Sequence, residues 1–247
     1  MKKILYLLLI VPLLSFAQSF TIEYDVSLNV LNRTGFLQYN KNETSFYYEK
    51  IKEVIEKDEK NQEVGTLNKT IYLGKNSNEV RVQIYDRKKD TLVCIDYLEG
   101  KEVICTEKFP LMDWKLENET KLIANYLCSK ATTNFRGRKY IAWYCSDLPI
   151  QVGPWKFNNL PGAIFQVYDE TNDYYWSATK ISKKTEDEKY EIDKNLKKIS
   201  LQEYIDQDEK FKEQISNKAV LKFVERGAEV LESKYHRGRE TKFEWEK

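Results

Sequence analysis

The sequence has a single histidine among its 247 residues, so the side chain that most often serves as a general acid or base is almost missing. It has no glycine-rich phosphate-binding loop, no nucleophile-elbow serine and no histidine pair at metal-binding spacing. The cysteines contain no Cys-x₂-Cys pair, and His236 lies apart from them in the charged tail. These absences argue against phosphate-binding, serine-hydrolase and zinc enzymes, and we expect no metal and no cofactor.

A dominant sign of charge is also lacking. Lys and Arg together number 40 and Asp and Glu together number 39, which gives a net charge of +1. The two signs are intermixed along the chain, so the balance gives no electrostatic reason to bind nucleic acid or anionic lipid. A nucleic-acid partner is therefore not expected.

Beyond its N-terminus the chain has no long apolar run. Lys2 and Lys3 precede an apolar stretch over residues 4–14, and small residues follow it. This pattern predicts a signal peptide over residues 1–17, with cleavage after Ala17. The stretch is shorter than the roughly 20 residues that span a bilayer. We therefore expect an exported protein, periplasmic or extracellular, that is soluble after cleavage and not transmembrane.

Aromatic residues, by contrast, are abundant, with 17 Tyr, 11 Phe and 5 Trp, and this enrichment favours β-structure. Residues 20–30 alternate apolar and polar side chains, as a half-buried strand does. The pattern over residues 18–182 predicts a mainly β fold (α+β overall), with a large curved antiparallel meander that can take the form of an open half-barrel. Further strands are expected at 35–39, 44–50, 70–74, 79–85, 91–98, 102–108, 127–135, 139–145, 163–168 and 174–182, with an exposed hairpin loop at 55–68.

The pattern changes toward the C-terminus. Residues 183–231 begin as a charged linker and continue with helical periodicity, and residues 232–247 form a charged tail. Ser200 and Glu203 make a capping box for a first amphipathic helix, and Asn217 is a candidate cap for a second. We expect the helices to cover the protein's own sheet, since an open sheet face needs cover, with a partner's surface as the alternative.

The four cysteines lie in the part of the chain that we expect to be exported, where disulfides persist. Each of two pairs is symmetric about a predicted two-residue turn, which places its members opposite each other across a hairpin. Of the three possible connectivities, the one that joins each pair ranks first. The pairs are Cys94 with Cys105, about residues 99–100, and Cys128 with Cys145, about residues 136–137.

A stretch of low charge, GPWKFNNLPGAIFQVYDE, covers residues 153–170. Leu160-Pro161-Gly162-Ala163 fits a type II turn, in which Pro161 presets its own φ and Gly162 supplies a positive φ. The segment AIFQVY that follows is apolar on nearly both faces, as a strand buried on both sides would be. We interpret the stretch as a tight apolar entry into a central strand.

Residues 127–169 also carry a resemblance to a known family. The motif Asn159-Leu160-Pro161-Gly162-Ala163-Ile164, preceded by Gly153-Pro154-Trp155-Lys156-Phe157 and by the Ala142-Trp143-Tyr144 strand, resembles the signature of the GLPGLI family of exported bacterial proteins. Asn159 and Ala163 depart from the residues that give that family its name. The resemblance implies export to the cell envelope, a β-rich fold and no established catalytic residues.

Two functional hypotheses follow. The first is a non-enzymatic envelope module that binds an apolar ligand or an envelope protein through aromatic surface around the loop. The alternative is an envelope hydrolase that uses the carboxylates of Asp169, Glu170 and Asp173, which cluster in the hairpin after the signature strand. Under the first hypothesis, the candidate binding residues are Trp155, Phe157, Leu160, Pro161, Gly162, Tyr175 and Trp176.

Overall fold

A computed structural model describes residues 19–29, 31–39, 44–54, 81–184, 192–193, 195–224 and 238–246. The predicted strand at 70–74, the predicted loop at 55–68 and the predicted signal peptide lie outside these residues. In chain order the elements are β1 (Ser19–Leu28), β2 (Leu31–Tyr39), β3 (Thr44–Val54), β4 (Arg81–Asp86), β5 (Thr91–Leu98), β6 (Lys101–Lys108), β7 (Lys115–Ile123), β8 (Tyr126–Phe135), β9 (Arg138–Cys145), β10 (Ala163–Asp169), β11 (Tyr174–Lys184), β12 (Lys197–Ser200) and α1 (Leu201–Val224).

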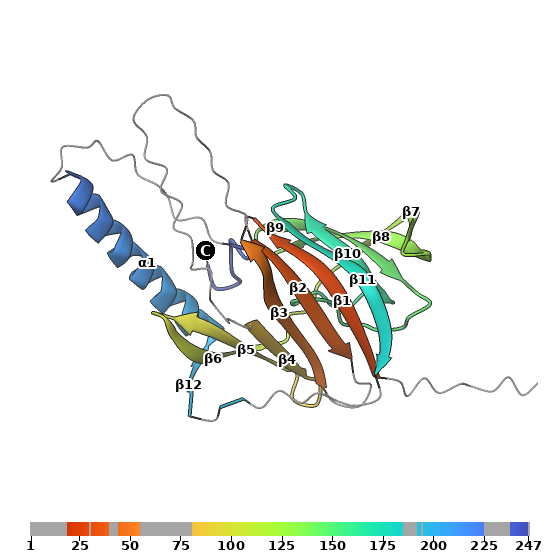
Figure 1. The fold of residues 1–247 in the computed structure, drawn as a ribbon, viewed down its shortest axis with the longest axis horizontal. Coiled ribbons are helices and arrows are strands. Elements are labelled where there is room, and N and C mark those ends of the chain that lie inside the picture. The colour runs from red at the N-terminus through yellow and green to blue at the C-terminus, as the bar shows by residue number, and fades with distance from the viewer. Residues whose placement is uncertain are drawn as a thin grey trace, which may run out of the picture.

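The strands form one curved sheet in the order β12-β6-β5-β4-β3-β2-β1-β11-β10-β9-β8-β7 (Figure 1). Strands β1 to β6 make one antiparallel meander and β7 to β11 make another, and the pairing of β1 with β11 joins the two. The short strand β12 adds to β6 in parallel at one edge, and β7 is the other edge. The predicted mainly β, open antiparallel fold is therefore confirmed.

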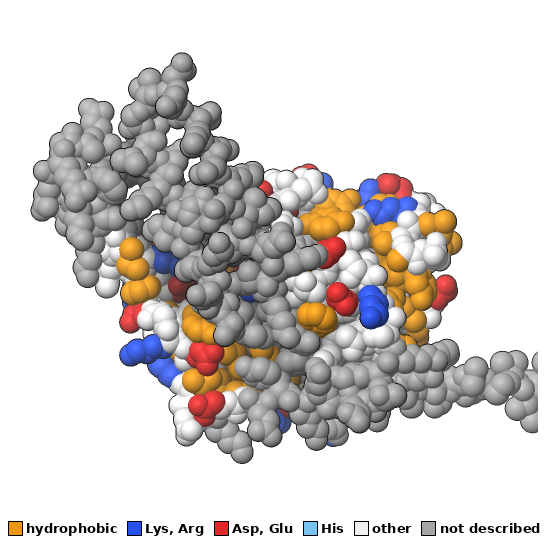
Figure 2. Space-filling model, viewed as in Figure 1, with side chains coloured by type: hydrophobic (Ala, Val, Ile, Leu, Met, Phe, Trp, Pro, Cys, Tyr) orange, Lys and Arg blue, Asp and Glu red, His pale blue; other side chains and the backbone are white. Residues whose placement is uncertain are grey.

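The sequence pattern missed the edge strand β7, because its residues KLENETKLI do not alternate. Most of its side chains are exposed, and no buried face imposes a period of two on it. At its hairpin with β8, Leu122 pairs directly with Leu127, and these side chains are 71% and 60% exposed. Figure 2 shows hydrophobic side chains gathered at this end of the sheet.

The predicted helix start is confirmed, but the predicted break is not. The backbone N–H of Glu203 donates to Ser200 Oγ at 3.1 Å, so the serine caps the first turn. One continuous helix then runs from Leu201 to Val224, through the position where Asn217 was expected to cap a second helix. Leu201 is buried against the sheet, whereas Ile215 is 48% exposed. The protein's own sheet therefore covers the first turns of α1.

The C-terminal residues 238–246 lie against the β8–β9 hairpin. Backbone N–H groups of Thr241 and Lys242 donate to the carbonyl oxygen of Arg136 at 2.8 and 3.1 Å. Gly137 has a φ of 82°, and a Cβ there would overlap Thr241, so the close approach requires glycine. Phe243 is 3% exposed, which anchors this part of the charged tail in a small core cluster.

The hairpin register agrees with the predicted cysteine pairs, but the predicted disulfides are wrong. Cys94 lies opposite Cys105, Cys128 and Cys145 continue the register of β8 with β9, and all four are free thiols. Burial raises the pKa of the Cys94 thiol well above its usual value, and that of Cys105 and of Cys128 to about 12. Because the thiolate is the form that reacts to make a disulfide, burial keeps these three cysteines unreactive.

In the part of the chain that the structure describes, no helix combines the length and the apolar character needed to cross a membrane.

Candidate functional site

The loop between β9 and β10 fills the main core instead of forming a surface. Trp155 and Phe157 are 4% and 0% exposed, and both rings pack on Trp176 of β11, which is fully buried. Trp155 has a φ of 51° and Asn159 a φ of 67°, so these two residues make the sharp bends that fold the loop back onto the sheet. Leu160, at 1% exposure, belongs to the same core cluster.

The other predicted binding residues lie apart from this aromatic group. Pro161 is exposed, and Tyr175 is partly buried, where its hydroxyl accepts a hydrogen bond from Gln166 Nε2 at 2.5 Å. Gly162 does not have the positive φ that a type II turn requires, so that expectation was wrong. Its glycine is needed because a Cβ would overlap the carbonyl of Cys145. The seven residues therefore do not form one surface.

A cluster of charged side chains, which we name the ion ring, joins this loop to the C-terminal segment. Lys156 Nζ lies 2.5 Å from Glu107 Oε1 and 2.9 Å from Glu240 Oε1. Arg136 Nη2 lies 2.7 Å from Glu107 Oε2, and Arg136 Nη1 contacts Glu240 Oε1. Each cation thus contacts both carboxylates. The four buried groups form a closed ring of alternating charge, with equal numbers of positive and negative charges.

The ring holds Lys156 and Glu240 in their charged forms. Burial alone would lower the pKa of the Lys156 amine, but the negative charges of Glu240 and Glu107 hold it above its usual value. Burial would raise the pKa of Glu240, but the charges of Lys156 and Arg136 hold it below its usual value. A carboxylate that stays ionised in this way is a poor proton donor near neutral pH. The ion ring is therefore suited to clamping the C-terminal segment onto the loop.

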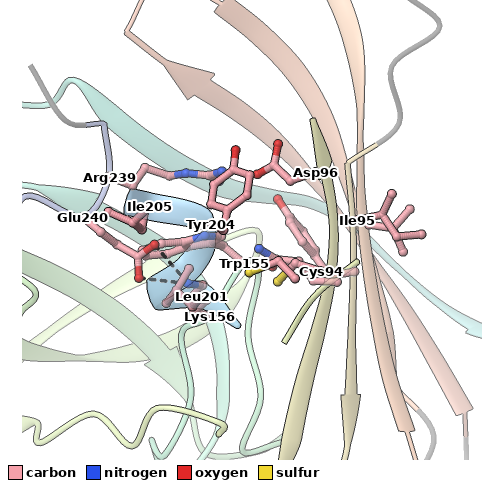
Figure 3. A pocket seen from close by; sticks show the side chains of 14 residues that line it. Cys94, Ile95, Asp96, Trp155, Lys156, Leu201, Tyr204, Ile205, Arg239 and Glu240 are labelled. Carbon is pink, nitrogen blue, oxygen red and sulfur yellow. Dashed lines mark hydrogen bonds and ion pairs between the residues drawn. The ribbon is translucent and has the colours of Figure 1, made fainter. Parts of the chain in front are cut away.

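A cavity of about 80 Å³ lies beside the ion ring (Figure 3). Lys156 and Glu240 line it together with Cys94 of β5 and Tyr204 of α1. This volume is well below the roughly 300–1,000 Å³ of sites for drug-sized ligands, so the cavity suits ordered water and not a sugar or a peptide. It belongs to the interior that the loop, the sheet and α1 enclose.

The carboxylates of the β10–β11 hairpin differ in their surroundings. Asp169 is 1% exposed and accepts hydrogen bonds from Arg138 Nη1, Thr171 Oγ1 and the backbone N–H of Tyr174 at 2.9, 2.6 and 2.9 Å. Asp173 is exposed, and its Oδ2 lies 2.7 Å from the same Thr171 hydroxyl. That hydroxyl has one hydrogen, which it can donate to only one carboxylate at a time. Glu170, also exposed, lies 3.0 Å from Lys139.

Sequence reasoning missed the ion ring, whose members come from four separate places in the chain. The available signals were weak: Lys156 is the one basic residue in the apolar stretch 153–170, and Arg136 precedes a turn glycine. Neither signal indicates a partner. The carboxylates that pair with them, Glu107 and Glu240, stand among many other acidic residues.

Comparison with known proteins gives one family. The family model described as "N-glycanase peptide, N-terminal domain" matches residues 36–206, which is more than half of the chain. A search of curated proteins finds no match. The predicted membership of the GLPGLI family is therefore wrong, and with it the hypothesis of a non-enzymatic envelope module for an apolar ligand or a protein partner.

Solved structures of PNGF-II share the fold. One, in space group P21, is 17% identical, with a TM-score of 0.54, and the match covers 78% of this chain and 33% of that one. Another, in space group C2, is 19% identical, with a TM-score of 0.51, and the match covers 77% and 32% of the two chains. The chain thus spans about a third of the length of these structures.

Proposed function

Because the chain belongs to the family of N-glycanase N-terminal domains, we propose that it takes part in the enzymatic release of N-linked glycans from peptides or proteins. The family match over residues 36–206 carries this proposal. The fold shared with PNGF-II supports it, since the match covers most of this chain and about a third of a chain more than twice as long. The substrate is thus a glycan attached to an asparagine side chain.

For the hydrolytic step we propose the carboxylates of the β10–β11 hairpin. Hydrolysis of the bond between the asparagine amide and the sugar requires a group that activates water, and an exposed carboxylate can act as that general base. Asp173 meets this requirement through its exposure. Asp169, which Arg138 and Tyr174 hold in place, supports it through the shared Thr171 hydroxyl.

We also propose that the protein is exported. The support is the composition of residues 1–17, with two lysines before an apolar stretch that is too short to span a bilayer. Export would place the protein where N-glycosylated substrates of other cells are found. N-terminal sequencing of the protein from a culture medium or periplasmic fraction tests this, and a chain that keeps Met1 in the cytoplasm contradicts it.

The test of function uses a synthetic N-glycopeptide and the same peptide without its glycan. Incubation with the purified chain is expected to free the glycan and leave an aspartate in place of the asparagine, which mass spectrometry detects. Binding of the glycopeptide in preference to the bare peptide is expected as well. A chain that neither releases the glycan nor distinguishes the two peptides would overturn the proposal.

A further inference from the structure

A second hollow, of about 230 Å³, lies between the ends of two strands and the β9–β10 loop. Tyr39 at the end of β2 and Tyr85 at the end of β4 line it on the sheet side. Gln151 and Asn158 line it on the loop side. We name it the Tyr85 cleft. It shares no lining residue with the cavity beside the ion ring. Its volume is below the roughly 300–1,000 Å³ of sites for drug-sized ligands, which suits a single small ring.

Flat aromatic rings form the sheet side of the cleft. Tyr85 stacks on Phe109, with ring centroids 3.6 Å apart and planes 16° apart. Phe109 is 5% exposed and supports Tyr85 from the core, whereas Tyr85 itself is only partly buried. Beside it, the Arg87 guanidinium lies 4.6 Å from the centroid of the Tyr39 ring. These contacts fix the orientation of the rings before any ligand arrives, and a preorganised aromatic surface binds at low entropic cost.

The loop side of the cleft has amide side chains beside apolar ones, and one of the amides carries an unpaired acceptor. Asn158 is 2% exposed, and its Nδ2 donates to the carbonyl oxygens of Pro110 and Lys156 at 2.7 and 2.8 Å. Its Oδ1 is buried and accepts no hydrogen bond from any described residue. A buried polar atom without a partner costs about 1–3 kcal/mol, so it calls for an ordered water as its partner. Gln151, which also lines the cleft, is an exposed residue and therefore stands at its rim.

Arg87 is the one charged residue among the described residues that line the hollow. The Asp90 carboxylate lies next to the lining, where Tyr85 Oη donates to its Oδ1 at 3.4 Å. Aromatic faces together with amide donors and acceptors complement a molecule that has both apolar C–H faces and many hydroxyl groups, which is the chemistry of a sugar ring.

We propose that the Tyr85 cleft binds one pyranose ring of the N-linked glycan, an assignment that rests on the proposed function. The sugar lies against the exposed face of Tyr85, and its hydroxyl or acetamido N–H groups donate to the side-chain amide oxygen of Gln151. Arg87 donates to the sugar oxygens from the opposite side. The rim position of Gln151 leaves the neighbouring sugars of the chain in solvent.

The cleft and the proposed hydrolytic carboxylates lie at opposite ends of β1. Phe20, near the start of β1, pairs with Tyr39 of the cleft, and Leu28, at its end, pairs with Tyr174, next to Asp173. Eight residues of extended strand separate Phe20 from Leu28, which corresponds to about 26 Å. The cleft therefore binds an outer sugar of the glycan and acts on affinity, not on the bond that is hydrolysed.

Isothermal titration calorimetry of the purified chain with a free high-mannose N-glycan tests the cleft. Tyr85→Ala removes the stacking face, and we expect its Kd to rise about threefold to tenfold. Gln151→Ala removes one rim amide, and a similar rise is expected from the loss of a hydrogen bond. Gln202→Ala, which changes another exposed glutamine, on α1, is the matched control and should leave the Kd unchanged. Near-ultraviolet circular dichroism confirms that each variant is folded.

Three outcomes separate this proposal from the proposed function. A glycan that binds the wild type and both cleft variants equally overturns the cleft, as does a wild type that binds no free glycan. Release of glycan from the glycopeptide with an unchanged KM in Tyr85→Ala overturns the cleft and leaves the function standing. In the third outcome, the wild type binds free glycan, both cleft variants bind it more weakly, and no glycan is released from the glycopeptide. This result supports the cleft and counts against the hydrolytic role.

Discussion

Trp155 and Trp176 stack with their ring centroids 5.9 Å apart and their planes 10° apart, although they come from a loop and from a central strand. Phe157 packs edge-on against both rings. Aromatic side chains of the loop therefore hold it inside the core. We name residues 153–162, which fill the core on one face of the sheet, the plug. Burial of aromatic side chains of this size contributes several kcal/mol to folding.

Trp155→Ala should destabilise the protein strongly. The change removes a side chain that is 4% exposed and leaves a cavity, and such changes cost about 3–5 kcal/mol. Urea denaturation followed by circular dichroism measures the loss in the free energy of unfolding. Leu122→Ala, at a site 71% exposed, is the control and should change stability by less than about 0.5 kcal/mol. A Trp155→Ala variant as stable as the control would contradict the plug.

The sequence predicted the plug's location but not its role. Low charge, two prolines and four aromatic residues marked residues 153–170 as unusual, and the strand after the loop was predicted correctly. Whether Trp155 faces solvent or core depends on its positive φ, which is rare for a non-glycine residue and has no signal in a single sequence. The alternating strands were predictable because their period reports a buried face, whereas β7 lacks that face.

Gly162→Ala tests the second way in which the loop is fixed. An added Cβ would overlap the backbone carbonyl of Cys145, and backbone atoms cannot move aside as a flexible side chain can. We expect the free energy of unfolding to fall by about 1–3 kcal/mol. Gly238→Ala is the matched control, because its Cβ would meet Tyr174 Oη at an ordinary contact distance of 3.6 Å. Equal stability of the two variants would argue against the close approach.

The cysteines give a chemical test of the thiol state. Four thiols per chain should react with a chromogenic disulfide reagent in denaturant without reductant, because all four are free. In the native protein at pH 8 we expect reaction to be slow, since burial raises the pKa of Cys105 and of Cys128 to about 12 and little thiolate is present. Two or fewer reactive thiols in denaturant would show that a disulfide forms.

The ion ring predicts how stability depends on pH. The pKa of Glu240 is lowered in the folded protein, so its contribution to stability is present above the unfolded value of about 4.3 and is lost as pH falls through the lower folded value. In Glu240→Gln, the free energy of unfolding should therefore fall less steeply than in the wild type as pH drops below about 4.3. The substitution should also destabilise the protein at pH 7 by about 3–5 kcal/mol, because the buried Lys156 then keeps only Glu107, which it shares with Arg136. Arg136 also keeps its contact with the more exposed Glu244.

Thermal denaturation between pH 3 and pH 7 measures this difference, with Glu213→Gln at an exposed position of α1 as the control. If the melting temperature of Glu240→Gln changes with pH in parallel with that of the wild type, the ion ring does not contribute to the pH dependence of stability.

Asp173→Asn tests the hydrolytic carboxylate with little risk to the fold. The change keeps the size of an exposed side chain and removes its capacity to take a proton from water, so glycan release should fall by about 100-fold or more. Asp193→Asn replaces another exposed aspartate, outside the hairpin, and should release glycan at the wild-type rate. If Asp173→Asn keeps full activity while the wild type releases glycan, the hydrolytic group lies elsewhere in the protein. Because the cleft is at the other end of β1, the same variant should bind free glycan with unchanged affinity, and this result separates substrate binding from hydrolysis.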